Sequence, residues 1–488
     1  MNKLRLFICV AIFMSVILSS CQSGKETLGK DSKAVDTTAE VTETSRANIP
    51  DNLPPLNFEG KTITIHVRGD DLAIGEVFIE NMTGNIVDDA IYERNMKVEE
   101  RLNVNIQIFK ADGWERYDNS ITQLKASIAA GDEAFDIVAG WSARIPQISI
   151  EGLLYNLVGI DHLDLDQPWW NQSCTEELLI GGKLYFITGD IAKSYLSAMQ
   201  MYLFNKKLAE DNKVENLYDV VREYRWTIDY VDRLIKDMYH DFNGNGEVDS
   251  GDSFGLVTAT WNYADAYMQS FRISMMSRDE NGMPVLNVDE ERMASCVEKV
   301  YNLLWGNQGC TTDTDGGPQF EIFIGDRALL TTVRVMELES TFNQMESDYG
   351  VLPFPMFDEN QKQYGTRIQD ALSIWCIPVD IKKPEISAAV LEALAAESYR
   401  KVTPAYYDVV LKNRYSRDED TAEMIDLIRS SALINFESIF NEAIGNPWFV
   451  MRNLINEKKN NFASYWASNK KVVETQLKKV VEEIQKIS

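Results

Sequence analysis

The chain has 488 residues, of which 75 are acidic and 48 are Lys or Arg, so its formal net charge at pH 7 is −27. This balance argues against nucleic-acid binding, because the chain offers no basic stripe to displace the counterions of phosphates. More than four hundred residues remain after the N-terminal region, which favours two domains over one.

The N-terminus predicts export. Lys3 and Arg5 precede an apolar stretch over residues 6–18, and small residues follow it. This pattern is typical of a secretory signal peptide over residues 1–20. The run LSSC, which ends at Cys21, resembles the bacterial lipoprotein signal. That resemblance implies a lipid on Cys21 and a location on the extracellular face of the cell membrane, and the alternative is an uncleaved anchor helix.

Residues 21–57 are predicted to form a flexible tether. The segment is rich in Ser, Thr, Lys, Glu and Asp and has almost no large apolar residues. Such a composition cannot bury enough surface to offset the entropy of ordering the chain. The folded part is therefore expected to begin near Phe58.

Four cysteines lie beyond the tether, namely Cys174, Cys296, Cys310 and Cys376. None has the CxxC spacing of zinc or redox sites. A bridge between Cys296 and Cys310 and a set of buried free thiols are both compatible with the sequence. The three histidines are scattered, and no GxSxG, Walker or GxGxxG pattern occurs, which lowers the prior for an enzyme.

The first folded segments predict a parallel sheet. Strands are expected over residues 61–68, 104–109 and 135–140, and helices with apolar residues at helical spacing over 86–102 and 117–130. This strand–helix order with short links implies parallel strands and right-handed crossovers. Ligands bind outside the carboxyl ends of such strands.

Trp141 and Arg144 follow the third of these strands. The indole of Trp141 could stack on an apolar ring face, and Arg144 could donate to hydroxyl groups or a carboxylate. The alternative is a tryptophan that plugs the rim of the sheet.

Residues 179–208 have the pattern of a crossing point between two lobes. Residues 183–188 predict a strand, Gly189-Asp190 a turn, and residues 199–205 a second strand. Ligands are commonly enclosed where two domains face each other. The alternative is an ordinary turn inside one domain.

Several short runs share their order and spacing with one known family. They are FDIVAGW at residues 135–141, PWWNQS at 168–173, GGKLYFITGD at 181–190, YRWT at 224–227, YGVLPFP at 349–355 and IWCIP at 374–378. In this order they resemble the family-one extracellular solute-binding proteins of ABC importers, which are maltose-binding-protein-like lipoproteins. The likeness spans residues 62–456, although each single run is loose. The double tryptophan of PWWN is expected to be a packing feature.

The resemblance implies an α/β fold of the type II periplasmic-binding-protein class, with two lobes of parallel-rich sheets flanked by helices and a ligand cleft between them. Crossings between the lobes are implied near residues 188–195, 320–328 and 370–378. The implied partition gives residues 58–190 and 323–374 to the first lobe, and 191–322 and 375–488 to the second. Helices over 387–399, 421–431 and 470–487 are expected to cover the second lobe, the last of them amphipathic rather than membrane-spanning.

Ligand contacts are predicted at the strand ends and crossings. Trp141, Asp190, Trp261, Arg334 and Asp370 occupy the positions that the resemblance places in the cleft. Two further candidates are Tyr263, beside Trp261, and Trp114, in a loop after a predicted strand. The alternatives are that Arg334 forms a structural ion pair with Glu337 and that Trp261 lies in a core.

An acidic loop over residues 241–252 fits the EF-hand calcium template. The predicted ligands are Asp241, Asn243, Asn245, the carbonyl of Glu247, Asp249 and Asp252. The twelfth position is Asp rather than Glu, and a strand rather than a second helix follows the loop. A structural Ca²⁺ is therefore predicted, and the alternative is an Asn/Gly/Asp-rich turn without metal.

The sequence therefore favours a lipid-anchored, monomeric binding protein that delivers a small solute, expected to be an oligosaccharide, to the membrane subunits of an ABC permease. Carboxylate and Arg side chains among tryptophans suit an uncharged sugar. The alternatives are a surface glycoside hydrolase that uses Asp190 with Asp370 or Glu337, a peptide-binding receptor in which Arg334 binds a carboxylate, and a calcium-dependent surface scaffold.

Overall fold

The structure is a computed structural model that describes residues 46–313, 318–415 and 418–487. These residues belong to one compact unit. The signal peptide, Cys21 and most of the predicted tether lie outside the described residues. For residues 46–57 the predicted tether is wrong, because Asp51 is buried and pairs with Arg101 and Arg400, so the fold begins before Phe58. Within the described ranges, no helix is both long enough and apolar enough to cross a membrane.

The first sheet has four strands in the order β12-β3-β1-β2. They are β1 (Lys61–Val67), β2 (Val104–Lys110), β3 (Ile137–Trp141) and β12 (Ser373–Cys376). As predicted, β1 pairs in parallel with both β2 and β3, whereas β12 runs antiparallel to β3. The carboxyl ends of β1, β2 and β3 therefore lie at one edge, and Trp141 is the last residue of β3.

The second sheet has five strands in the order β10-β4-β9-β5-β8. They are β4 (Gln200–Asn205), β5 (Phe254–Ala259), β8 (Cys310–Asp313), β9 (Ala328–Arg334) and β10 (Tyr349–Leu352). β5 is parallel to β8 and β9, and β4 is antiparallel to β9 and β10. Two short pairs complete the strands: β6 (Met276–Arg278) with β7 (Pro284–Leu286), and β11 (Thr366–Arg367) with β13 (Ala432–Leu433).

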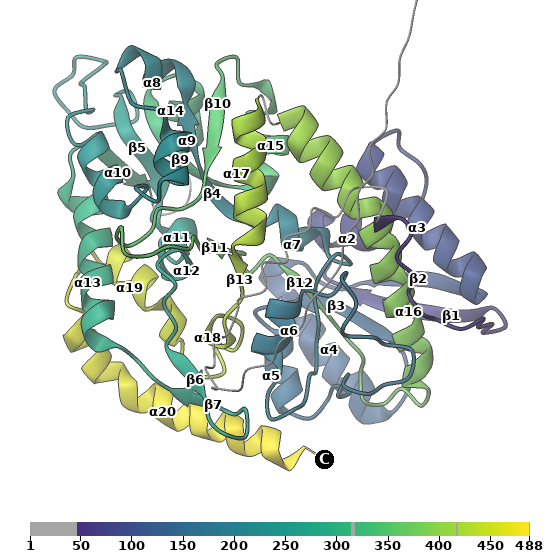
Figure 1. The fold of residues 1–488 in the computed structure, drawn as a ribbon. Coiled ribbons are helices and arrows are strands. Elements are labelled where there is room, and N and C mark those ends of the chain that lie inside the picture. The colour runs from purple at the N-terminus through teal and green to yellow at the C-terminus, as the bar shows by residue number, and fades with distance from the viewer. Residues whose placement is uncertain (1–45, 314–317, 416–417, 488) are drawn as a thin grey trace, which may run out of the picture. The chain divides into compact units, whose positions relative to one another are not determined.

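Helices surround both sheets (Figure 1). The longer ones before β4 are α2 (Asp71–Val77), α3 (Ile86–Leu102), α4 (Tyr117–Ala130), α5 (Ile145–Ile150), α6 (Gln172–Leu178) and α7 (Lys193–Ser197). Between β4 and β10 lie α8 (Lys206–Asp211), α9 (Leu217–Arg222), α10 (Ile228–Ile235), α11 (Thr260–Tyr263), α12 (Ala266–Ser270), α13 (Glu290–Tyr301), α14 (Gln319–Ile324) and α15 (Val335–Ser340). The C-terminal part holds α16 (Pro384–Glu397), α17 (Glu419–Ser430), α18 (Phe436–Ile439), α19 (Val450–Asn456) and α20 (Phe462–Lys486).

Local sequence signals define several of these helix ends. The side chain of Asn85 accepts hydrogen bonds from the first free backbone N–H groups of α3, and Asn103 ends that helix in the left-handed conformation. Gly131 ends α4 with φ 66°, a value that a side chain disfavours. The predicted helices 86–102 and 117–130 are therefore confirmed with their bounds.

The predicted strand over residues 183–188 is wrong. It makes only isolated bridges, of which Ile187 with Trp375 is one, because the segment is already leaving the first sheet. The chain then reaches the second sheet at β4, so a crossing does occur in this region. It returns to the first sheet between β11 and β12, over residues 368–372, which overlaps the predicted crossing 370–378.

The predicted crossing at residues 320–328 is also wrong. α14 packs on β5 and β9, and β9 and β10 pair with β4, so this stretch stays with the second sheet. The predicted assignment of residues 323–374 to the first lobe therefore fails for β9 and β10. The remaining crossing lies between α16, which contacts α3 beside the first sheet, and α17, which contacts β10.

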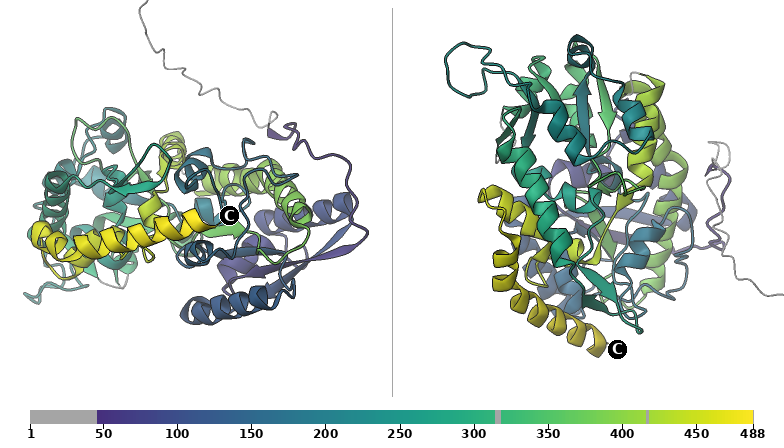
Figure 2. Two further views of the ribbon diagram at one scale, coloured as in Figure 1. Left: turned by 90° about the horizontal axis from the view of Figure 1, so that it is seen from below. Right: turned by 60° about the vertical axis from the view of Figure 1, so that its left-hand side comes forward.

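The C-terminal helices consequently divide between the two sheets. α16 does not cover the second lobe as predicted, because its contacts are with α3. α20 contacts α13 and α5, and Lys183 Nζ donates to the carbonyl of Ile487 just beyond its end. Figure 2 shows α20 as the long yellow helix in both views.

The four described cysteines are free thiols, so the alternative of a bridge between Cys296 and Cys310 is excluded. Burial raises the pKa of the Cys296 thiol to about 12. A buried thiol of this kind behaves as a small apolar side chain rather than as a nucleophile.

Candidate functional site

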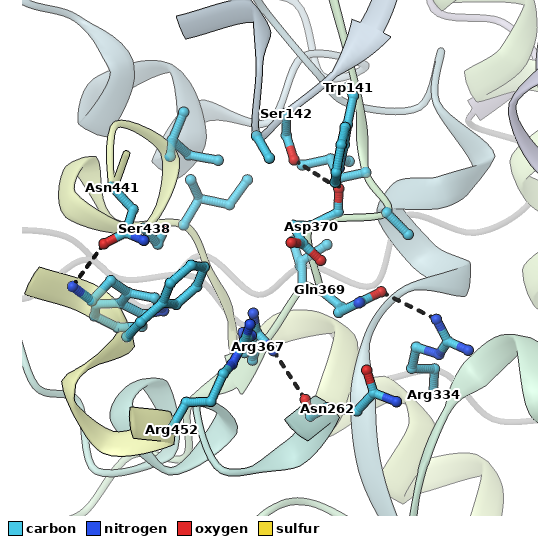
Figure 3. Close-up of a pocket in the computed structure, with 18 of the residues that line it drawn as sticks. Trp141, Ser142, Asn262, Arg334, Arg367, Gln369, Asp370, Ser438, Asn441 and Arg452 are labelled. Atoms are coloured by element: carbon cyan, nitrogen blue, oxygen red, sulfur yellow. Dashed lines mark hydrogen bonds between the residues drawn. The ribbon is translucent and has the colours of Figure 1, made fainter. Parts of the chain in front are cut away.

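A cavity of about 640 Å³ lies between the two sheets. Residues from the ends of β3, β5 and β9, from the β11–β12 link and from the segment before α20 surround it (Figure 3). Its lining residues are Leu72, Trp114, Trp141, Ser142, Ala143, Trp261, Asn262, Arg334, Met336, Arg367, Ile368, Gln369, Asp370, Ala371, Leu372, Ile434, Ser438, Ile439, Asn441, Glu442, Trp448, Phe449 and Arg452. This volume is in the range of pockets that bury most of a small ligand.

Two perpendicular tryptophans form the wall beside the first sheet. Trp114 and Trp141 pack edge to face, with ring centroids 4.9 Å apart. The guanidinium of Arg68, a fully buried side chain, lies 3.5 Å from the ring centroid of Trp114. Trp141 Nε1 donates to the backbone carbonyl of Asp370 at 2.6 Å, and Ser142 Oγ donates to the same oxygen at 3.0 Å. The two indoles are therefore held in fixed orientations.

The opposite wall begins where β5 passes into α11. Trp261 is 52% exposed, which is unusual for a tryptophan, and it lines the cavity. The carbonyl of Asn262 accepts from Gln200 Nε2 at 2.7 Å, which fixes the start of this helix. Tyr263 is buried and lies outside the cavity lining, and burial raises its pKa. The alternative that Trp261 lies in a core is wrong.

Arg334, the last residue of β9, lines the cavity but already has a partner. Its Nε donates to Glu337 at 2.8 Å, and its Nη1 donates to Gln369 at 3.2 Å. Burial lowers the pKa of Arg334, but the carboxylate of Glu337 outweighs this effect and the net pKa is raised. The predicted alternative of an ion pair with Glu337 is therefore confirmed, and the pair is part of the cavity wall.

Besides Tyr263, two predicted residues lie outside the cavity lining. Arg144 is outside the lining, where its guanidinium pairs with Asp118 at 2.7 Å and with Glu442, which does line the cavity. Asp190 lies in a separate cavity of about 320 Å³ next to the first crossing, 4.0 Å from Arg429. Burial raises the pKa of Asp190. Trp141, Trp261, Arg334 and Asp370 are thus the predicted residues that one cavity brings together, and Trp114 joins them.

Sequence reasoning missed the deepest charged group. Arg367 and Arg452 line the cavity and are almost fully buried, and both pair with Asp265. Burial lowers the pKa of Arg367, and the Asp265 carboxylate opposes this shift. Asn441 and the neighbouring aromatic residues of the α18–α19 region also line the site. These segments carry no motif, and only the tertiary fold brings them to the cavity.

The predicted calcium loop lies between α10 and β5, and its polar side chains bond within the loop. Asp241 accepts hydrogen bonds from two glycine N–H groups of the loop. Asn243 and Asn245 donate to Asp249 at 2.9 and 2.7 Å, and Asp252 accepts from a tyrosine hydroxyl. Among the described residues, no group of three or more His, Cys, Asp or Glu side chains is arranged to hold a metal ion. Calcium binding stays a prediction.

No protein-family model and no curated protein sequence matches the chain. Solved structures do. The cyclo/maltodextrin-binding protein complexed with maltotetraose is 12% identical, with a TM-score of 0.55 over 87% of this chain and 97% of that one. The galacto-N-biose-/lacto-N-biose I-binding protein of the ABC transporter from Bifidobacterium longum is 14% identical, with a TM-score of 0.56 over 86% and 98%. The GacH receptor of Streptomyces glaucescens is 13% identical, with a TM-score of 0.51 over 88% and 100%.

The chain has the fold of these binding proteins. The expected α/β class with two sheets and flanking helices is therefore confirmed. At this level of identity, the ligands of those proteins do not transfer to this chain by likeness alone.

Proposed function

We propose that this protein is the extracellular solute-binding subunit of an ABC importer and that it captures an oligosaccharide. The observation that carries the proposal is the cavity between the two sheets, because tryptophans line it from both sides. Trp114 and Trp141 offer ring faces or edges on one side and Trp261 on the other. Aromatic faces suit the C–H surfaces of sugars, and the surrounding amide, carboxylate and guanidinium groups suit their hydroxyls. Permease subunits in the membrane would receive the solute from the monomeric protein.

The glycoside hydrolase has less support. Its proposed carboxylates are not together, because Asp190 lies in the other cavity and Glu337 is held by Arg334. Asp370 alone of the three lines the site. The peptide-receptor alternative relied on Arg334, whose guanidinium is likewise engaged. Incubation of the purified protein with the sugar that it binds should release no reducing ends, and turnover would favour the hydrolase.

The binding proposal is tested by native mass spectrometry of the purified protein, followed by calorimetry with the sugar that co-purifies. Trp261→Ala should weaken binding roughly tenfold, since a stacked aromatic ring contributes about 1 kcal/mol or more. Its thermal midpoint should hardly change, because the ring is half exposed. Phe242→Ala is the matched control, an exposed aromatic residue outside the cavity lining. Equal effects of the two substitutions would contradict the proposal.

We also propose that Cys21 carries the lipid that anchors the protein on the outer face of the cell membrane. Replacement of Cys21 by Ser should move the protein from the membrane fraction to the medium. Retention of the variant in membranes would favour an uncleaved anchor helix instead.

A structural Ca²⁺ in the loop over residues 241–252 is a further proposal, supported by the spacing of its oxygen ligands. Calcium should raise the thermal midpoint of protein that has been treated with a chelator, since it would neutralise Asp241, Asp249 and Asp252. Asp249→Asn should abolish that rise, whereas Asp279→Asn, in the hairpin of β6 and β7, should not. An unchanged midpoint after complete chelation would leave the turn without metal.

A further inference from the structure

The floor of the cavity holds more buried positive charge than negative. Arg367 and Arg452 are 4% and 6% exposed, and the carboxylate between them belongs to Asp265, which is fully buried. Arg367 Nη2 lies 3.6 Å from Asp265 Oδ2, and Arg452 Nη2 contacts the same oxygen. Two guanidinium groups thus share one carboxylate, and the proximity of Arg452 contributes to the lowered pKa of Arg367. A buried excess charge is costly unless a counter-ion reaches it.

The other charges of the cavity wall already have partners. Arg334 pairs with Glu337, and Glu442 pairs with Arg144. Asp370 is the exception, because it makes no ion pair with any residue that the structure describes. The negative charge of Asp370 opposes the lowering of the Arg367 pKa, so Asp370 offsets part of the positive charge of Arg367. A ligand that contacts both groups would find an acceptor at Asp370 and donors at Arg367 and Arg452.

Arg452 has a donor that the described residues leave unused. Its Nε is buried and has no hydrogen-bond partner among the described residues. Aromatic rings hold the group in place instead, with the Phe449 centroid at 4.2 Å and the Trp261 centroid at 4.8 Å. Figure 3 shows the side chains of Arg452 and Arg367 converging below the cavity. A planar guanidinium fixed in this way at the cavity wall is suited to bind a carboxylate.

We propose that the ligand is an acidic oligosaccharide, one that contains a uronic acid unit whose carboxylate binds Arg452 and Arg367. This inference rests on the proposed function and adds the charge of the sugar to it. The anion supplies the missing counter-charge of the Arg367–Asp265–Arg452 group, and Trp261 stacks on the ring that carries it. Asp370, whose charge acts on Arg367, accepts hydroxyl groups of the same ligand. This proposal differs from the uncharged sugar expected from the sequence alone.

The test is a binding array of neutral and acidic glycans. Calorimetry then measures the affinity for every glycan that binds and, for each acidic one, the affinity for its carboxyl-reduced counterpart. The ligands with the highest affinity should be uronic acid oligosaccharides, and reduction of the carboxyl group should lower their affinity roughly tenfold or more. Their affinity should also fall as NaCl rises from low to high concentration, because the attraction is electrostatic. The reduced counterparts should show little salt dependence.

Substitutions identify the residue responsible. Arg452→Gln should lower the affinity for the acidic glycan roughly tenfold and leave that for its reduced counterpart nearly unchanged. Asp370→Asn should lower the affinity for the acidic glycan and also that for its reduced counterpart. Arg429→Gln is the matched control, since Arg429 also lies over an aromatic ring and near a carboxylate, but in the other cavity. If Arg452→Gln fails to fold, Arg452→Lys keeps the charge and should lose part of the preference for the acid.

Each outcome of the array decides the matter. Neutral glycans that bind as tightly as acidic ones, or an unchanged preference in Arg452→Gln, would overturn the inference and leave the proposed function intact. Absence of binding to every glycan would overturn both. Selective binding of acidic glycans that depends on Arg452 would support both.

Discussion

Glu392 is a fully buried carboxylate whose hydrogen-bond donors are all uncharged. Its oxygens accept from Trp169 Nε1 at 3.1 Å, from Trp170 Nε1 at 3.0 Å and from the backbone N–H of Asp164 at 3.3 Å. The double tryptophan of PWWN is thus a packing feature, as predicted. Burial raises the pKa of Glu392 to about 8, because these donors compensate only part of its lost hydration.

This raised pKa makes stability depend on pH. Between the ordinary pKa of a glutamate and about 8, the folded protein binds a proton at Glu392 that the unfolded chain has released. The free energy of unfolding should therefore fall as the pH rises through this range, by up to about 1.4 kcal/mol for each step of one in pH. Glu392→Gln should flatten this fall when urea unfolding is measured at pH 5 and at pH 8.5. Glu474→Gln, at an exposed position of α20, should keep the wild-type slope, and an equal slope in all three proteins would contradict the assignment.

Residue types and spacing could predict some members of the site but not its charge balance. Trp141 and Trp261 follow apolar strands, so their place at strand ends could be expected from local pattern. Arg452 and Asp265 lie in segments without a motif, and their pairing depends on α19 lying against α11. Burial of an acid inside a predicted helix, as at Glu392, also leaves no mark in the sequence.

Among the elements, α20 shows how well an amphipathic pattern predicts which residues of a helix are buried. Its stripe was predicted to dock on the protein, and Val473, Leu477, Val480 and Ile484 are buried. Val472, which the pattern placed on the same stripe, is 51% exposed. Helices with long regular patterns could be predicted from the sequence. The strand predicted over residues 183–188 could not, because this segment makes only isolated bridges and no continuous pairing with another strand.

Two substitutions on α20 test this docking. Leu477→Ala should lower the free energy of unfolding by about 2–3 kcal/mol, because it removes buried apolar volume that the neighbouring elements cannot refill. Val472→Ala, on the same helix but half exposed, should change it by less than about 0.5 kcal/mol. Chemical denaturation of both variants gives the comparison. Similar small effects would mean that the helix does not dock in solution as it does in the structure.

At the scale of the whole molecule, the sequence could predict two sheets but not which late segments join them. β12 pairs with β3 although more than 230 residues separate them, and β9 and β10 complete the second sheet. Such pairings depend on which exposed strand edge each segment meets, and residue patterns alone do not record this. The predicted crossings near 188–195 and 370–378 fall at turn signals. The crossing predicted at residues 320–328 does not occur, because this segment contains α14, which packs against β5 and β9 of the second sheet.

The ion pair between Arg144 and Glu442 links the two sides of the cavity. Arg144 follows β3 of the first sheet, and Glu442 precedes α19, which contacts α11 and α13 beside the second sheet. A protein of this fold that closes on its solute should hold it longer when such a contact joins the two sides of the cavity. Because the pair is partly exposed and Arg144 keeps Asp118, its contribution should be no more than about 1 kcal/mol.

Glu442→Gln should therefore speed dissociation of the bound sugar by up to about fivefold, since it removes a contact that joins the two sides of the cavity. Stopped-flow fluorescence can follow the rates of dissociation and association, because Trp114, Trp141 and Trp261 line the cavity. Glu290→Gln, which removes an exposed ion pair with Lys470 away from the cavity, is the matched control. A slower association with unchanged dissociation would show instead that Glu442 guides the ligand in rather than retaining it.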